Sequence, residues 1–223
     1  MWAKLAFVHS IDRDLAEFYE EEAASGRRTP PHGPRVVFRA RFIEALLDEG
    51  RRSVLEGGSG PGHERQAFAD AGLEHLGIDL AVGNADLAPG LGATVIPASL
   101  YAPPFRSGAF DAFWSMSTLM HVPFDRFDEV MTAIVRVLAP GSPLGVGIWG
   151  SSGPTDREFV SEFEGNGTRR LFSLRTAATN EAMFAAHVTL ECFEVHDELG
   201  PDDWTYHLVL ARTPDGARVS GRS

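Results

Sequence analysis

The chain has 223 residues, of which 43% are hydrophobic, which suffices for one α/β domain with its own buried core and is short for two. A formal net charge of −11 repels phosphate backbones, so nucleic acid is not expected as a substrate. The one cysteine, Cys192, excludes an internal disulfide and fits a reducing cytoplasm. We see neither a signal peptide nor an apolar run of the ~20 residues that a membrane helix needs, so we expect a cytoplasmic protein that binds no membrane. The oligomeric state is not indicated.

The first part of the chain differs in composition from the rest. Residues 1–34 pass from an acidic, helix-like stretch into a break rich in proline and glycine, which predicts a helical cap. The next stretch has the period of a helix that ends at Gly50, and its apolar residues fall on one face: Val36, Ala40, Ile43 and Leu47. We expect this helix to pack through that face.

Short apolar runs then alternate with helical patterns. Strands are predicted at residues 53–56, 76–79, 94–97, 110–116 and 144–149. Helices are predicted at 63–72 and 126–138, and a poor one, broken by a proline and glycines, inside 81–92. The longest of them turns six residues inward: Phe127, Val130, Met131, Ile134, Val137 and Leu138. This alternation implies a parallel sheet covered on both faces, and residues 189–199 and 204–212 are typical of a closing antiparallel hairpin.

Residues 151–175 are a candidate lid. Thr155 and Glu158 have the spacing of a capping box, which marks the start of a helix. Phe159 and Phe163 fall on one face of the helix that would follow.

The strongest signal for function is a glycine-rich loop directly after the first predicted strand. The strand ends in Glu56, and Gly58, Gly60 and Gly62 follow at every second position before a helix begins. Glycine is needed where a backbone turns sharply or touches a ligand, and ligands of open α/β sheets bind at the carboxyl ends of the strands. The loop therefore predicts a ligand site at this edge of the sheet.

A nicotinamide dinucleotide is the obvious competing ligand for such a loop. Its fingerprint, G-x-G-x-x-G, would place a third glycine at residue 63, where the chain has His63. Glu56 would also set an anion beside the pyrophosphate, whereas an acid suits a cationic ligand that carries a sulfonium and an ammonium.

The acid-x-G-x-G-x-G pattern resembles the first motif of the class I S-adenosylmethionine-dependent methyltransferases, and most closely their small-molecule group of type 11 or type 12. The resemblance extends over about residues 50–150 and includes three further segments: 104–115, 119–123 and 136–142. It implies a doubly wound α/β fold whose seven-stranded sheet is mostly parallel with an antiparallel last strand, under an N-terminal helical cap. It also implies S-adenosyl-L-methionine as cofactor and methyl transfer to an oxygen, nitrogen or carbon atom of a small molecule. We expect one domain over residues 1–213 and a disordered tail over 214–223.

The resemblance also assigns the cofactor-binding residues. The loop acid and the three glycines surround the methionine part, and Asp79, at the end of the next strand, takes both ribose hydroxyls. Ala98 stands where the family usually has an acid near the adenine, so Ser99 and Leu100 are expected to flank the ring instead. Ser115, near the carboxyl end of the fourth strand, is expected to face the cofactor.

Methyl transfer from a sulfonium is an in-line displacement, in which the protein mainly aligns the acceptor and excludes water. A base is needed only when the acceptor must lose a proton, and His121, which follows the fourth strand, is the best candidate. Tyr19 from the cap, and Arg169 and Phe172 from the lid, are candidates to contact the acceptor. The histidines, the cysteine and the carboxylates have no metal-ligand spacing, so no metal is expected.

Two alternatives stay open. The chain could bind the cofactor without catalysis, since Ala98 and the loose segment 83–92 permit weak or altered binding. The other alternative is a nicotinamide-dependent oxidoreductase, against which His63 argues.

Overall fold

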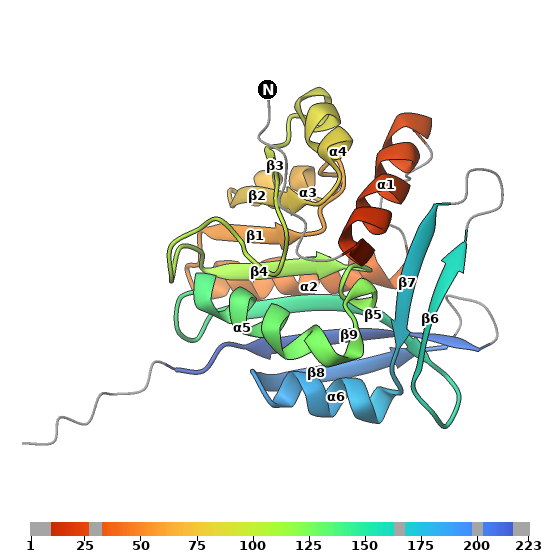
Figure 1. Ribbon diagram of the computed structural model, residues 1–223. Helices are drawn as coiled ribbons and strands as arrows, with labels where there is room; N and C mark the ends of the chain where they lie inside the picture. Colours follow the sequence, from red (N-terminus) through yellow and green to blue (C-terminus); the bar gives the residue numbers. More distant parts are fainter. Residues whose placement is uncertain (1–9, 27–32, 163–167, 198–202, 216–223) are drawn as a thin grey trace, which may run out of the picture.

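A seven-stranded sheet forms the centre of the computed structural model, which describes residues 10–26, 33–162, 168–197 and 203–215 (Figure 1). Its strands are β1 Ser53–Gly57, β2 Glu74–Asp79, β3 Val95–Pro97, β4 Ala112–Met116, β5 Pro143–Ser151, β8 Thr189–His196 and β9 Trp204–Arg212. They lie in the order β3-β2-β1-β4-β5-β9-β8. The first five pair in parallel, and β9 runs antiparallel to β5 and to β8 on either side of it. The predicted mostly parallel sheet, antiparallel last strand and closing hairpin are confirmed.

Helices cover both faces of the sheet (Figure 1). They are α1 Ser10–Ser25, α2 Pro34–Asp48, α3 Arg65–Asp70, α4 Val82–Leu87, α5 Phe127–Val137 and α6 Ala177–Ala185, with three short 3-10 turns, η1 Ala88–Leu91, η2 Leu119–His121 and η3 Phe124–Arg126. Side chains of α2 and α3 share one core with Trp114, whereas α5 and α6 share the other with Phe113, its neighbour on β4. Successive strand residues point to opposite faces, so β4 joins the two cores.

The amphipathic helix predicted at 126–138 is confirmed as α5. All six of the residues predicted to point inward are buried. Its sequence pattern is clear because one face alone contacts the sheet.

The first helix after the cap packs through a different face from the one predicted. Phe38, Phe42 and Leu46 of α2 are buried, whereas Val36 and Leu47 are 37% and 49% exposed. The reason is Trp114, against which Phe38 stacks with the ring centroids 5.5 Å apart and Phe42 packs at 5.0 Å. Large aromatic side chains bury more area than the β-branched and aliphatic ones on the predicted face.

The lid region forms a β-hairpin and not the predicted helix. Strands β6 (Arg157–Glu162) and β7 (Arg169–Leu174) pair antiparallel beside α1 (Figure 1). Phe159 lies opposite Phe172, and the two rings stack with centroids 5.6 Å apart, a cross-strand contact that stabilises the hairpin. The carboxylate of Glu158 closes no capping box, because it accepts hydrogen bonds from Ser173 Oγ and from the backbone of Phe124. Phe163 lies outside the described residues.

The described parts of the chain contain no helix that is long and apolar enough to cross a membrane. Most of the predicted tail, from residue 216 onward, lies outside the described ranges, as do residues 1–9 and 27–32 of the predicted cap.

Candidate active site

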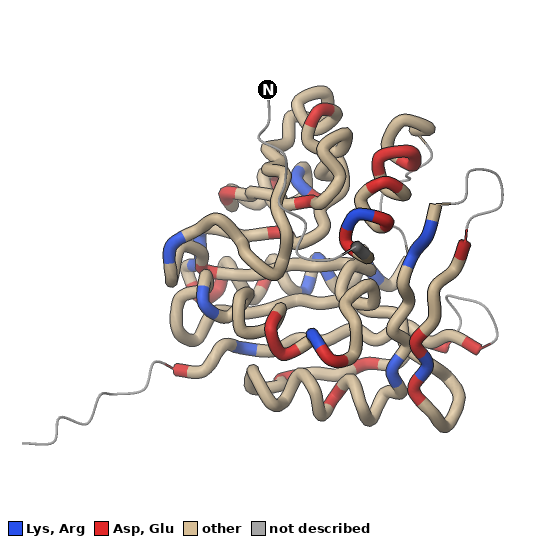
Figure 2. The backbone as a smooth tube through the Cα atoms, in the orientation of Figure 1, with Lys and Arg blue, Asp and Glu red and all other residues tan. Residues whose placement is uncertain are grey.

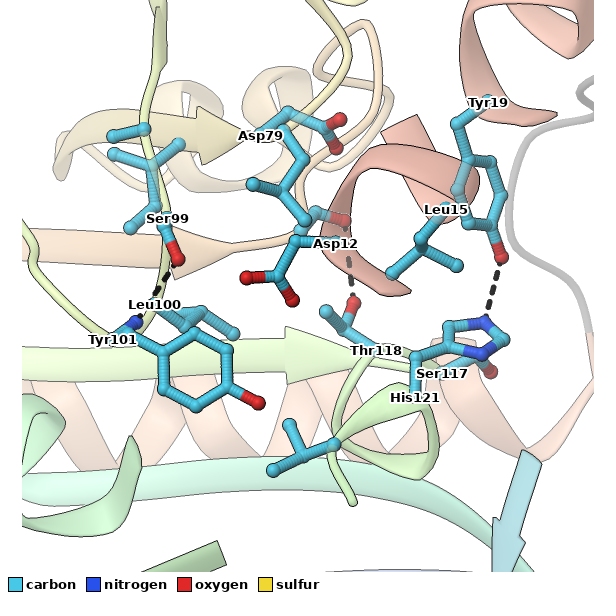
Figure 3. A pocket seen from close by; sticks show the side chains of 15 residues that line it. Asp12, Leu15, Tyr19, Asp79, Ser99, Leu100, Tyr101, Ser117, Thr118 and His121 are labelled. Atoms are coloured by element: carbon cyan, nitrogen blue, oxygen red, sulfur yellow. Dashed lines mark hydrogen bonds between the residues drawn. The ribbon is translucent and has the colours of Figure 1, made fainter. Parts of the chain in front are cut away.

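The order of strands in the sheet reverses next to β1, which places a crevice at the carboxyl ends of β1 and β4. A pocket that is partly open to solvent lies there (Figure 3). Its walls come from the loop after β1, the ends of β2 and β3, the turn after β4 and helix α1. Segments from across the chain thus meet at one site.

The glycine loop turns sharply at the base of this pocket. The backbone amides of Gly58 and Ser59 both donate to the carbonyl of Ile78, at 2.8 and 3.1 Å. Gly58, Gly60 and Gly62 have φ values of 68°, 57° and 88°, a region that favours glycine. A Cβ on Gly58 would lie 2.1 Å from Thr118 Oγ1, where it would intrude on the pocket wall. Glycine at 58 therefore keeps the site open.

The last glycine of the motif has a packing role. A Cβ on Gly62 would lie 2.4 Å from the Cβ of Ala93, so glycine allows the loop to approach the start of β3. Of the three predicted glycines, Gly58 lines the pocket, whereas Gly60 and Gly62 shape the loop behind it.

Asp79 joins β2 to the glycine loop and lines the pocket. Its Oδ2 accepts a hydrogen bond of 2.7 Å from the amide of Gly60, and its Oδ1 accepts from the amide of Ala81 and from Asn84 Nδ2. A carboxylate has about four acceptor positions, so about one is left for a ligand. In this geometry Asp79 can take one ribose hydroxyl directly, and both only if one of its present bonds gives way.

Two residues predicted to touch the cofactor lie behind the pocket. Glu56 is buried, and its Oε2 shares a hydrogen bond of 2.8 Å with His75 Nε2, while Phe68 stacks on the His75 ring. Ser115 is fully buried and donates from Oγ to the carbonyl of Gly57, at 2.8 Å, which ties β4 to β1. Neither residue is part of the pocket lining.

The end of β3 forms the wall at which the adenine was predicted. Ala98, Ser99 and Leu100 are buried and line the pocket, next to Tyr101. Ser99 Oγ accepts a hydrogen bond from the amide of Tyr101, and the guanidinium of Arg126 lies over the Tyr101 ring at 4.0 Å. Burial, together with nearby carboxylates, raises the pKa of the Tyr101 hydroxyl, which therefore stays protonated at neutral pH.

Helix α1 covers the pocket and contributes Asp12, Leu15 and Tyr19 to its lining (Figure 3). Glu20 accepts a hydrogen bond of 2.8 Å from the amide of Gly83 at the start of α4. On the other side of the helix, Asp14 pairs with Arg169 of β7 at 3.4 Å. The described part of the predicted cap is thus attached to the body from both sides.

Tyr19 and His121 meet inside the pocket. Tyr19 Oη lies 2.8 Å from His121 Nε2 (Figure 3). On the other side of the ring, His121 Nδ1 lies 2.6 Å from the carbonyl oxygen of Leu171 on β7. A carbonyl only accepts hydrogen bonds, so Nδ1 carries the hydrogen of the neutral ring. Nε2 is then the acceptor, and the Tyr19 hydroxyl donates to it.

The two residues predicted from the lid lie outside the pocket lining. Phe172 is buried behind His121, with the ring centroids 5.1 Å apart, and also packs against Trp204. Arg169 is exposed and pairs with Asp14 and, at 3.9 Å, with Glu162. The hairpin therefore supports the pocket from behind.

A strained residue follows β4. Ser117 lines the pocket with φ of 57°, a conformation that is uncommon for a residue with a side chain. Its Oγ accepts a hydrogen bond of 2.7 Å from Arg35 and shares one of 3.1 Å with Tyr206, whose ring lies under the Arg35 guanidinium. Strain of this kind gathers at functional sites. Asp12, Tyr101, Ser117 and Thr118 were all missed in the sequence, because no local pattern marks them.

The charge of the pocket is negative. Asp12 and Asp79 are buried among its lining, and the described residues that line it include no lysine or arginine. Helix α1 itself carries six carboxylates and one arginine (Figure 2). Such a wall favours a cationic ligand and opposes a pyrophosphate. Within the described ranges, no group of three His, Cys, Asp or Glu side chains is placed to hold a metal ion.

Comparison with known proteins agrees with this architecture. Residues 55–145 match the protein family described as "Methyltransferase domain". An uncharacterized methyltransferase of Mycobacterium avium is 35% identical over 151 residues, which make up 63% of this chain and 58% of that protein. The chain thus spans less than two thirds of the length of this relative.

Solved structures share the fold over most of the chain. The 1,6-didemethyltoxoflavin-N1-methyltransferase of Burkholderia thailandensis, with bound 1,6-didemethyltoxoflavin and S-adenosylhomocysteine, is 20% identical at a TM-score of 0.70, covering 96% of this chain and 94% of that chain. The [4+2]-cyclase SpnF is 19% identical at a TM-score of 0.61, covering 91% and 94%. At these identities the likeness concerns the fold, and the second protein is named for a different reaction.

Residues 55–145 thus resemble the methyltransferase domain family, and the described chain has the fold of the solved structures named above. The predicted fold class is confirmed, and the match over residues 55–145 agrees with the predicted family.

Proposed function

We propose that the chain transfers a methyl group from S-adenosylmethionine to a small molecule held in the pocket between α1 and the carboxyl ends of β1 and β4. The observation that carries this proposal is the continuity of one pocket from the glycine loop and Asp79 to Tyr19 and His121. The glycine loop and Asp79 suit the binding of a cofactor, and Tyr19 and His121 suit the chemistry of an acceptor.

The cofactor would lie along the loop and the ends of β2 and β3. We propose that Gly58 contacts its methionine part, that Asp79 binds the ribose, and that Ser99 and Leu100 flank the adenine. The carboxylates of Asp12 and Asp79 favour its positive charge. Bound there, the cofactor supplies an electrophilic methyl group.

The remaining residues that were predicted to bind the cofactor would act from behind the pocket lining. We propose that Glu56, Gly60, Gly62 and Ser115 hold the loop and strand ends in place through the contacts described above.

The acceptor would enter between the cap and the turn after β4. We propose that His121 is the base and that Tyr19 contacts the acceptor, with Phe172 supporting the histidine and Arg169 fixing the hairpin to α1. A small-molecule acceptor and a cytoplasmic location stay predictions from the sequence, as does the absence of nucleic acid among the partners.

The competing functions predict different ligands. A nicotinamide dinucleotide needs donors for its pyrophosphate, and the described lining offers Asp12 and Asp79 instead. A protein that binds the cofactor without catalysis would need no base, so the placement of His121 favours an enzyme.

The experiment that tests the proposal is incubation of the purified protein with S-adenosylmethionine labelled in the methyl group and a panel of small alcohols, phenols, amines and carboxylic acids. We expect label in one class of acceptor and S-adenosylhomocysteine in equal amount. Binding of the cofactor with no transfer to any acceptor would favour the non-catalytic alternative.

A further inference from the structure

The hydrogen bonds around His121 restrict which proton it can take. The carbonyl of Leu171 fixes the hydrogen on Nδ1, so the lone pair of Nε2 is the basic one. That lone pair is occupied by the hydroxyl of Tyr19, and His121 is only 6% exposed. Both residues line the pocket, so an acceptor there reaches the Nε2 lone pair through the Tyr19 hydroxyl.

We propose that Tyr19 is the catalytic group that faces the acceptor, that His121 takes its proton, and that the acceptor reacts through a hydroxyl group. This inference rests on the proposed methyltransferase function and deepens it. A hydroxyl must lose its proton as it is methylated, whereas a neutral amine can attack first and a carboxylate carries no proton at neutral pH. A buried tyrosine–histidine pair at the acceptor end of the pocket can take the proton of a hydroxyl and is superfluous for an amine or a carboxylate.

Methylation of the hydroxyl couples the formation of one bond and the cleavage of another to two proton transfers. The acceptor oxygen forms a bond to the methyl carbon, and the carbon–sulfur bond breaks with its electron pair left on the sulfur of S-adenosylhomocysteine. The acceptor proton passes to Tyr19 Oη, whose own hydrogen moves to His121 Nε2 along the 2.8 Å hydrogen bond. The products are the methyl ether, S-adenosylhomocysteine, a neutral tyrosine and an imidazolium, which returns its proton to solvent after release.

The surroundings of His121 suit the imidazolium. Its Nδ1–H stays bonded to the Leu171 carbonyl in both charge states. The ring of Phe172 lies 5.1 Å away, within the range at which an aromatic ring attracts a cation. The carboxylate of Asp12 lines the same pocket and has the opposite charge.

The competing explanation is that the hydrogen bond between Tyr19 and His121 only attaches the N-terminal cap to the rest of the protein. Helix α1 already has other attachments, from Glu20 to the amide of Gly83 and from Phe18 to the guanidinium of Arg170, which lies over its ring at 4.0 Å. Glu20→Ala removes one of these without touching Tyr19 or His121, so it serves as the control for attachment.

The first test needs no acceptor. Nuclear magnetic resonance of the protein with nitrogen-labelled histidine and bound S-adenosylhomocysteine reports which ring nitrogen of His121 carries hydrogen, with His121→Asn for assignment. We expect hydrogen on Nδ1, an unprotonated Nε2, and a shift of the Nε2 resonance in Tyr19→Phe. Hydrogen on Nε2 would overturn the proposal.

The second test uses the acceptor panel. Among alcohols, phenols, amines and carboxylic acids, we expect methylation of a hydroxyl, and Tyr19→Phe should lower kcat by about 10²–10⁴-fold, with the KM for S-adenosylmethionine within about threefold. Glu20→Ala should keep kcat within about threefold of the native value. Methylation confined to amines or carboxylates, an unchanged kcat in Tyr19→Phe, or equal losses in both variants would overturn it. Transfer to no acceptor at all would instead count against the methyltransferase function, and the resonance measurement would still decide the position of the proton.

Discussion

The carboxylate of Asp79 accepts a hydrogen bond of 2.7 Å from the backbone amide of Gly60, which lies 19 residues earlier in the chain. This bond sets the end of β2 against the glycine loop and forms one side of the pocket. A single residue therefore shapes the loop and lines the pocket. We expect Asp79 to couple cofactor binding to the geometry of the loop, so that a substitution in the loop affects both.

Gly58→Ala is expected to weaken binding of S-adenosylhomocysteine more than it weakens the fold. A Cβ would lie 2.1 Å from Thr118 Oγ1 and push that side chain toward the pocket. Gly72→Ala is the matched control, since Gly72 also has a positive φ, of 77°, but no atom lies within 4 Å of the added Cβ. Gly72→Ala should lose about 1 kcal/mol of folding free energy from its positive φ, and Gly58→Ala should lose more because of the close contact with Thr118; urea unfolding measures both losses. Calorimetry should show a lower affinity for S-adenosylhomocysteine only in Gly58→Ala. A similar loss of affinity in both variants would contradict the account.

Ser117→Gly is expected to be more stable than Ser117→Ala, by about 1 kcal/mol. Both variants lose the Oγ that accepts from Arg35 and bonds to Tyr206, so this loss cancels in the comparison. Glycine alone relieves the positive φ of 57°. Thermal or urea unfolding of the two variants measures the difference. Equal stability would show that the backbone at Ser117 is not strained.

Much of the fold could be predicted because its signals are local. The period of residues 126–138 and the strand that ends in Asp79 need only neighbouring residues to be read. The packing of α2 and the hairpin β6–β7 depend instead on residues distant in the sequence. Trp114 selects the face of α2 that carries Phe38, and Phe172 is the partner that makes a strand of the segment around Phe159.

The site could be predicted in part for the same reason. The glycine loop and Asp79 form a compact motif, and His121 follows a strand end. Asp12 comes from the N-terminal cap, and no sequence motif indicates where this cap lies over the sheet. Ser117 is distinguished only by its backbone conformation. Contacts that join α1 to the turn after β4 exist only once the chain has folded.

The stability of the protein should fall in mild acid because of His207, which is fully buried. Asn180 Nδ2 donates to its Nδ1, and its Nε2–H donates to Thr205 Oγ1, so the folded ring is neutral. Burial lowers the pKa of His207 from 6.5 to about 4. Between these values the unfolded chain binds a proton that the folded chain does not, so the free energy of unfolding decreases as the pH falls, by up to about 3 kcal/mol.

His207→Gln removes this titration. Urea unfolding at about pH 7 and about pH 4.5 should show a smaller loss of stability in the variant than in the native chain. The same loss in both proteins would mean that other groups govern the acid response.

Calorimetric titration tests most sharply whether this pocket binds S-adenosylmethionine through Asp79. The native protein, Asp79→Asn and Asp111→Asn are each titrated with S-adenosylmethionine and with S-adenosylhomocysteine. Asp111 is the matched control, because its carboxylate also accepts from backbone amides, those of Arg52 and Ser53, but at the opposite edge of the sheet. We expect the native protein and Asp111→Asn to bind both ligands, and Asp79→Asn to lose about 1–3 kcal/mol of binding free energy. A folded native protein that binds neither ligand, or an Asp79→Asn variant that binds as tightly as the native protein, would contradict the account.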